Sequence, residues 1–178
     1  MMKSVWNVDS VHSEIGFSIK HMMISKAKGN FISFDGEIKA DLDQFTDAEI
    51  KLTIDVSSVD TRNKGRDDHL RSADFFDVEN HPKATFISKE IKKTSDNHYE
   101  VIGDLTLKGT TKTVALEVIV EGQSKDPMSG NTVAGFSGET TISRKDFDLT
   151  WNTTLETGGV LLSDDVKISF EIEAHKQD

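Results

Sequence analysis

The chain has no cysteine among its 178 residues. Disulfides, thiolate zinc sites, iron–sulfur clusters and cysteine nucleophiles are therefore excluded. Long apolar runs are also missing, since no stretch approaches the roughly 18 consecutive apolar residues that a membrane-spanning helix needs. The sequence must therefore build its stability from an ordinary hydrophobic core.

Positive charge is in short supply. The 21 basic and 31 acidic side chains give a formal net charge of -10. Such a surface repels phosphate backbones, which predicts that nucleic acids are not partners. Asp9, His12 and Glu14 stand where a secretory signal peptide needs an unbroken apolar segment. The sequence therefore predicts a soluble, cytoplasmic protein.

Hydrophobic residues make up only 35% of the chain, which predicts a thin core beneath much polar surface. They alternate with polar residues at a period of two, as in Ile15–Ile19, Leu52–Val56, Val114–Val120 and Val166–Ile172. This alternation is typical of strands with one buried and one exposed face. Antiparallel sheets tolerate that asymmetry, so the fold class is predicted to be all-β and antiparallel.

Turn-forming residues separate the alternating runs, as at Ser95–Asn97 and Lys108–Thr110. Two irregular segments, residues 58–82 and 143–164, interrupt the pattern. In the first of them, apolar residues at helical spacing predict a short helical segment near residues 66–78. The alternation predicts about eight long strands, at residues 12–21, 30–41, 48–57, 84–93, 98–108, 112–121, 132–142 and 164–174, and a short one at residues 3–8.

Antiparallel strands in this number need protection for their edges, and closure into a barrel removes the edges altogether. About eight strands enclose just enough room for side chains or for one small ligand. The alternation alone leaves a barrel and a sandwich open. The two irregular segments are candidate covers for an open barrel mouth. Because no linker divides the chain, residues 1–178 are predicted to form one domain.

Several motifs occur in order along the chain: Trp6–Asp9, His12–Phe17, His21–Met23, Gly29–Phe31, Val59–Asn63, Arg66–Val78, His81–Phe86, Gly103–Gly109 and Ile142–Leu149. Together they resemble the motifs of the YceI-like family over residues 6–174. The resemblance implies an extended, lipocalin-like, eight-stranded antiparallel barrel. It also implies a long apolar cavity for a polyisoprenoid or a similar long-chain amphiphilic lipid, and it makes a homodimer plausible.

The candidate ligand-binding residues are aromatic, aliphatic and histidine side chains of the strands and the irregular segments. Phe75 and Phe76 are neighbours on the predicted helix and point about 100° apart, so one can pack on the barrel while the other faces the cavity. Methionine adapts its shape to flexible ligands. The predicted set is Phe17, His21, Met22, Phe34, His69, Leu70, Phe75, Phe76, Phe86, Leu105, Phe147 and Trp151.

No acidic residue occurs in residues 15–34, although the chain as a whole is acidic. Within this window, residues 22–29 are predicted to connect two strands at one end of the barrel. A solvated loop is the plainer interpretation of its lysines. The functional interpretation is a basic rim that receives an anionic headgroup. The predicted rim consists of Lys26, Lys28, Arg62 and Arg66.

The sequence predicts a lipid carrier, store or sensor that is not an enzyme and that needs no metal and no cofactor. The alternative is an enzyme that acts on a lipid- or quinone-like substrate through His69 with Asp67 or Asp68. The plainer prediction is that these two aspartates cap the helix and bond Arg62 or Arg66. A third hypothesis is a structural or interaction protein whose barrel is filled by its own side chains.

Overall fold

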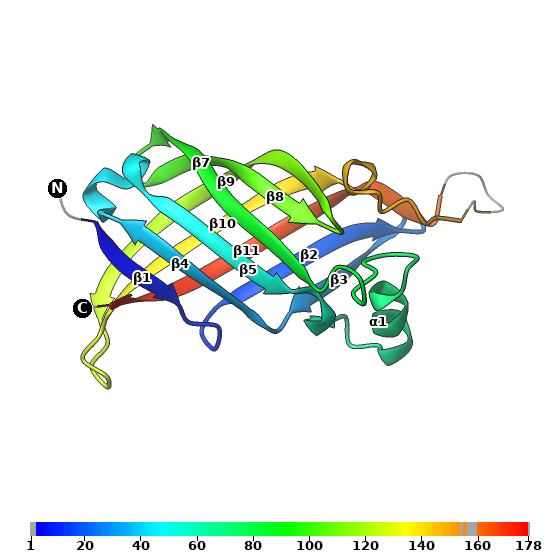
Figure 1. Ribbon diagram of the computed structural model, residues 1–178, viewed down its shortest axis with the longest axis horizontal. Coiled ribbons are helices and arrows are strands. Elements are labelled where there is room, and N and C mark those ends of the chain that lie inside the picture. Colours follow the sequence, from blue (N-terminus) through cyan, green and yellow to red (C-terminus); the bar gives the residue numbers. More distant parts are fainter. Residues whose placement is uncertain (1–2, 154, 156–159, 178) are drawn as a thin grey trace.

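One antiparallel ladder of strands runs through the molecule (Figure 1). The structure is a computed structural model that describes residues 3–153, 155 and 160–177. The helices are α1 (Lys64–Arg71) and the 3-10 helices η1 (Leu42–Asp47), η2 (Val56–Ser58) and η3 (Arg144–Phe147). The strands are β1 (Ser4–Val8), β2 (Glu14–His21), β3 (Ser25–Phe31), β4 (Phe34–Ala40), β5 (Glu49–Asp55), β6 (Val59–Asp60), β7 (Lys83–Ser95), β8 (His98–Leu107), β9 (Thr110–Lys125), β10 (Thr132–Ser143) and β11 (Leu162–Gln177).

The ladder closes on itself. Its order is β1-β4-β5-β7-β8-β9-β10-β11, and β11 pairs back onto β1. β2 follows β1 along the same side of β11, and β3 pairs with β2 where β4 pairs with β1. β1 and β2 therefore together form one of the eight strand positions of the barrel wall, and β3 and β4 together form another. The predicted all-β, eight-stranded antiparallel barrel is confirmed.

Aromatic side chains plug one end of the barrel. η1 buries Phe45, whose ring lies 5.0 Å from Tyr99 and 5.7 Å from Phe136. Trp6 of β1 is buried in the same cluster. β1 begins and β11 ends at this plugged end, whereas α1 lies at the opposite end (Figure 1). Any open mouth must therefore be on the α1 side.

Phenylalanine rings rest on glycines of neighbouring strands inside the barrel. In each case a Cβ on the glycine would lie 2.6 Å from the Cζ atom of the ring, so only glycine fits. The rings are thereby held against the wall and leave the barrel axis free. The pairs are Phe17 on Gly29, Phe86 on Gly103 and Phe170 on Gly138.

The strand predicted at residues 30–41 is two strands, and the first of them, β3, begins at Ser25. Only residues 22–24 connect β2 to β3, so the predicted connection over residues 22–29 is wrong. The inward-facing positions of β3 include Ala27 and Gly29, which are too small to produce a visible apolar alternation.

Helix α1 also differs from the prediction, because it ends at Arg71 rather than near residue 78. Asn63 is its N-cap and accepts a hydrogen bond from the backbone N–H of Arg66 at 2.9 Å. At the other end, the backbone N–H and the hydroxyl of Ser72 both donate to the carbonyl of His69. Residues 73–76 form a turn, so Phe75 and Phe76 lie beyond the helix.

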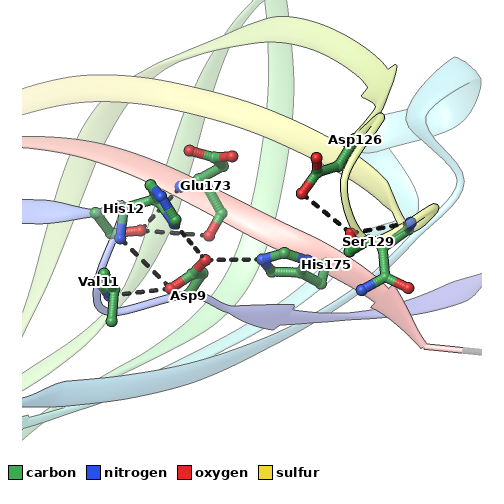
Figure 2. A network of polar contacts seen from close by, with 9 residues as sticks. Asp9, Val11, His12, Asp126, Ser129, Glu173 and His175 are labelled. Carbon is green, nitrogen blue, oxygen red and sulfur yellow. Dashed lines mark hydrogen bonds and ion pairs between the residues drawn. The ribbon is translucent and has the colours of Figure 1, made fainter.

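A polar network fastens the connection between β1 and β2 to the end of β11 (Figure 2). The Asp9 carboxylate lies 2.8 Å from His12 Nδ1 and 2.7 Å from His175 Nε2. The Asp9 N–H donates to the carbonyl of Glu173, and the Ser13 hydroxyl donates to the same carbonyl. The contact with His12, followed by that with His175, holds the pKa of Asp9 far below its ordinary value. The Asp9 carboxylate in turn raises the pKa of His12.

We expect this network to make stability depend on pH. The pKa of His12 is raised above 6.5 in the folded state. The contribution of His12 to the free energy of unfolding is therefore complete below pH 6.5 and is lost as the pH rises through the folded-state pKa. The lowered pKa of Asp9 has the opposite pH dependence. Its contribution to the free energy of unfolding is complete above pH 3.8 and is lost as the pH falls through the folded-state pKa in strong acid. Between about pH 6 and about pH 9, Tm should fall less in His12→Gln than in the native protein. Equal falls in both would contradict this account.

Candidate ligand-binding cavity

An apolar cavity of about 260 Å³ lies inside the barrel at the α1 end. Its wall consists of inward-facing strand residues, which the alternation within each strand places on one side. The wall residues are Ile15, Phe17, Ile19, Ala27, Phe31, Ile54, Ala84, Leu105, Leu107, Ile142, Val166 and Ile168.

Aromatic side chains from both irregular segments meet over the mouth. The His69 ring of α1 lies edge-on to Phe75 at 5.0 Å and to Trp151 at 4.8 Å. Phe75 and Trp151 also contact each other at 5.2 Å. Phe76 reaches Phe31 in the wall, with ring centroids 5.9 Å apart. These contacts join residues far apart in the sequence into one cover.

A second apolar space, of about 120 Å³, lies next to the cavity on the side of the plugged end. The two spaces share Ile15, Ile54, Leu105 and Ile168 in their linings. Phe45 of the plug lines the second space. The two apolar spaces therefore lie one after the other inside the barrel, the smaller beside the plug and the larger beneath the aromatic rings.

Two larger hollows, of about 700 Å³ and 810 Å³, are lined in part by carboxylate side chains. Their lining residues include outward-facing, exposed glutamates such as Glu117 and Glu121. These hollows therefore lie on the outer wall and lack the apolar character of the interior.

The polar residues that border the inner cavity are neutral or cationic. Although the chain carries a net charge of -10, no aspartate or glutamate stands among the described residues of this lining. The interior is therefore electrostatically unlike the rest of the protein. The polar lining residues are His21, Lys28, Thr61, Arg66, His69 and Arg144.

Arg66 is held at the cavity by Thr61. Its Nε donates to Thr61 Oγ1 at 2.7 Å, and its Nη2 donates to the Thr61 carbonyl at 2.6 Å. The Thr61 hydroxyl donates onward to Asp67, which is only 7% exposed. Within the described part of the chain, the Arg66 guanidinium has no carboxylate within ion-pair distance. Its charge is thus positioned but not neutralised.

Arg144 is only 5% exposed and ties the segment after η3 to the barrel. Its Nε donates to the Ser163 carbonyl at 2.9 Å, and its Nη1 donates to the carbonyls of Leu149 at 2.8 Å and Trp151 at 3.1 Å. Burial lowers the pKa of Arg144, but an arginine remains protonated at neutral pH. Its Nη2 bonds none of the described residues, which leaves one donor edge for a ligand.

The predicted pairing of His69 with Asp67 or Asp68 is wrong. His69 Nε2 lies 2.9 Å from Asp74 Oδ2, in the turn that follows α1. Because the helix ends at residue 71, the chain folds back and brings Asp74 to the ring.

Asp67 and Asp68 have other structural roles than the predicted ones. Asp67 accepts hydrogen bonds from the backbone N–H and the hydroxyl of Thr61. Asp68 pairs with Arg71 at 3.0 Å and with Lys64 at 3.5 Å. Asn63 caps the helix in their place, and the partners of the two aspartates do not include the side chains of Arg62 or Arg66.

Most of the predicted ligand-binding side chains are brought together by the fold. Phe34 and Phe147 are instead buried outside the cavity lining, and Met22 is exposed in the β2–β3 turn. Phe86 lines the deeper space only. The residues that line the cavity are Phe17, His21, His69, Leu70, Phe75, Phe76, Leu105 and Trp151.

The predicted headgroup rim is divided. Arg66 and Lys28 border the cavity, whereas Lys26 and Arg62 do not. The side chains of Lys26 and Lys28 lie on the outer face of β3, since Ala27 between them lines the cavity, so it is the main chain of Lys28 that borders the cavity.

Sequence reasoning missed Arg144, although a signal was present. Phe136 and Ile142 are buried inward positions of β10, and a period of two continued from them falls on Arg144. An arginine at an inward position needs hydrogen-bond partners, so it marks a functional or bracing site.

Comparison with known proteins settles the family. The model of the YceI-like domain matches residues 6–174. The chain belongs to the YceI-like family. This YceI-like protein is 45% identical to a UPF0312 protein of Staphylococcus epidermidis over 168 residues, which cover 94% of this chain and 95% of that protein.

Solved structures share the fold of this YceI-like protein. Burkholderia cenocepacia BcnA superposes with a TM-score of 0.82 at 30% identity, over 93% of this chain and 98% of BcnA. A polyisoprenoid binding domain from Saccharophagus degradans, implicated in plant cell wall breakdown, superposes with a TM-score of 0.71 at 16% identity. That alignment covers 97% of this chain and 98% of the domain, and it shows the common fold alone.

The described residues of this YceI-like protein include no helix that is long and apolar enough to cross a membrane. They also include no group of three or more histidine, aspartate or glutamate side chains placed to hold a metal ion.

Proposed function

We propose that this protein binds one long-chain amphiphile, with the apolar chain along the barrel axis and the polar head at the α1 end. The observation that carries the proposal is the pair of neighbouring apolar spaces inside the barrel, the larger of which is lined by the guanidinium groups of Arg66 and Arg144 and, among the described residues, by no carboxylate. The two spaces together fall in the range of roughly 300–1,000 Å³ typical of small-molecule sites.

The chemistry of the lining favours a polyisoprenoid or a similar lipid chain. Each methylene group moved from water into such an interior contributes about 0.8 kcal/mol, so tight binding needs few polar contacts. The same fold in a polyisoprenoid binding domain supports this ligand class. A carrier, a store and a sensor all need this cavity, and none of these roles needs a catalytic group, a metal or a cofactor.

The head of the ligand is proposed to be an anion such as a carboxylate or a phosphate. Arg66 and the free edge of Arg144 supply charge-assisted donors, and no acidic side chain competes for them in the described lining.

Arg66→Gln is expected to weaken binding of a long-chain fatty acid by about tenfold, because a charge-assisted hydrogen bond is lost. Binding of the corresponding alcohol should change much less. Calorimetric titration of both ligands measures the difference. Arg62→Gln is the matched control, since Arg62 lies nearby and does not border the cavity. Equal losses for acid and alcohol would contradict the assignment of the head.

Native mass spectrometry of gently purified protein, followed by lipid identification, tests the proposed function itself. The expected result is a bound species with a long apolar chain. Repeated absence of any bound lipid, together with no tryptophan fluorescence response to an added isoprenoid, would overturn the proposal.

The alternative, an enzyme acting on a lipid- or quinone-like substrate, loses the residue pair on which it rested. The carboxylate at His69 belongs to Asp74, and the His69 ring packs nearly perpendicular to the rings of Phe75 and Trp151. This arrangement orients an aromatic cover, and we therefore propose binding without chemistry. A homodimer stays a prediction from the resemblance alone.

A further inference from the structure

The hairpin that joins β2 to β3 exposes an apolar tip beside the cavity mouth. Met22, Met23 and Ile24 form its turn and are 44%, 56% and 84% exposed. His21, directly before the turn, lines the cavity. The Met22 N–H donates to the carbonyl of Leu161 at 2.7 Å, which couples the turn to the segment that covers the mouth.

The backbone of this turn does not suit its residues. Met22 has φ 53° and Met23 has φ 64°, and the Ile24 N–H donates to the His21 carbonyl at 3.2 Å. These are features of a type I′ turn, which asparagine and glycine normally occupy. Methionine in this left-handed region is strained. Glycine or asparagine would avoid this strain, so two successive exposed methionines here point to a role outside folding.

Charge on the outer face of the same hairpin is also unfavourable. Lys20 and Lys26 are direct cross-strand partners, and Lys28 lies two residues further along the same face. Like charges placed directly opposite destabilise a strand pair. Throughout the described part of the chain, none of these three lysines takes part in an ion pair. The surrounding residues 15–34 contain no acid that could neutralise them.

We propose that this hairpin docks the protein on an anionic lipid bilayer. Residues 22–24 insert among the headgroups, and Lys20, Lys26 and Lys28 contact the lipid phosphates. The bilayer removes the apolar tip from water and relieves the repulsion between the lysines. The inference rests on the proposed function, because docking there sets the cavity mouth against a source of lipid. A protein partner fits less well, since a three-residue tip is far smaller than the roughly 800 Å² per partner of a standard protein interface.

Flotation with lipid vesicles tests the proposal. The native protein is expected to float with vesicles of phosphatidylcholine and phosphatidylglycerol and not with phosphatidylcholine alone. Lys20→Gln with Lys26→Gln should weaken the association roughly 30-fold, from about fivefold per charge. Met23→Gly with Ile24→Thr should weaken it about tenfold. Glycine accepts a positive φ, so the second variant should keep or raise the Tm, and its loss cannot be ascribed to misfolding.

Matched controls lie in the hairpins at the plugged end (Figure 1). Lys92 lies near the end of β7 and Lys125 at the end of β9. The double variant Lys92→Gln, Lys125→Gln changes the net charge by the same amount as Lys20→Gln with Lys26→Gln. Met128→Ser removes a methionine that is 95% exposed in the β9–β10 connection. Both controls should float like the native protein. Failure of the native protein to float, equal flotation with phosphatidylcholine alone, or an equal loss in the controls would overturn the proposal, as would capture by a protein partner in place of vesicles.

Calorimetric titration of a fatty acid without vesicles separates this inference from the proposed function. The Met23→Gly, Ile24→Thr variant should bind the fatty acid like the native protein. Fatty-acid binding without vesicle binding would overturn the docking proposal alone. Vesicle binding without fatty-acid binding would overturn the cavity proposal alone.

Discussion

Replacing Ala27 with tryptophan is expected to weaken binding of a long-chain fatty acid by roughly 200-fold. Ala27 faces the cavity from β3, and its cross-strand partner Ile19 also lines the cavity. An indole placed there displaces the equivalent of about four methylene groups of the ligand, each contributing about 0.8 kcal/mol. Since the cavity measures about 260 Å³, the ring enters existing space rather than the packed wall. Isothermal titration calorimetry measures the effect.

Ala115→Trp is the matched control for this substitution. Ala115 is exposed on the outer face of β9, so the same ring is added outside the barrel. It should leave fatty-acid affinity unchanged within a factor of about two. If Ala27→Trp bound the fatty acid like the native protein, the ligand would not occupy the cavity.

Replacing Arg144 with leucine is expected to destabilise the protein by on the order of 3 kcal/mol. The substitution removes three hydrogen bonds from a charged donor and leaves the carbonyls of Leu149, Trp151 and Ser163 without their partner. For a chain of this size the loss corresponds to a fall in Tm of roughly 6–12 °C. Differential scanning calorimetry gives the Tm. Hydrogen exchange should become faster at residues 149–153, which Arg144 holds.

Asp164→Asn serves as the comparison for Arg144, because it changes a charge in the same neighbourhood. Asp164 accepts from the Ser143 hydroxyl, which lowers its pKa, and does not hold the Leu149 or Trp151 carbonyl. It should speed exchange at residues 149–153 much less than Arg144→Leu does. An Arg144→Leu protein with native Tm and native exchange would show that Arg144 does not brace the cover.

The strands could be predicted where side chains of contrasting polarity alternate, as in β9 and β11. The same rule failed at β3, where Ala27 and Gly29 occupy inward positions without a visible apolar signal. Closure of the barrel could not be predicted from the alternation, because a periodic pattern shows which face of a strand is buried but not which strand lies beside it. The family resemblance supplied that information.

The aromatic cover could be predicted as a set of residues but not as a set of contacts. His69 and Trp151 meet at 4.8 Å although 82 positions separate them in the sequence. The predicted partners of His69 were Asp67 and Asp68, its neighbours on a helix that was predicted to extend to residue 78 but ends at Arg71. Once Ser72 ends the helix, the turn brings Asp74 to the ring. The C-cap of α1 at Ser72 therefore determines that the carboxylate of Asp74 contacts His69.

Quenching of Trp151 by a fatty acid brominated beside its carboxyl group reports where the bound ligand lies in the barrel. Trp151 lines the cavity near the guanidinium groups, whereas Trp6 is buried at the plugged end. We expect saturable quenching in the native protein and little quenching in Trp151→Phe, where Trp6 alone emits. No saturable quenching in the native protein, or equal quenching in Trp151→Phe, would contradict a ligand whose chain lies in the barrel and whose head lies at the mouth.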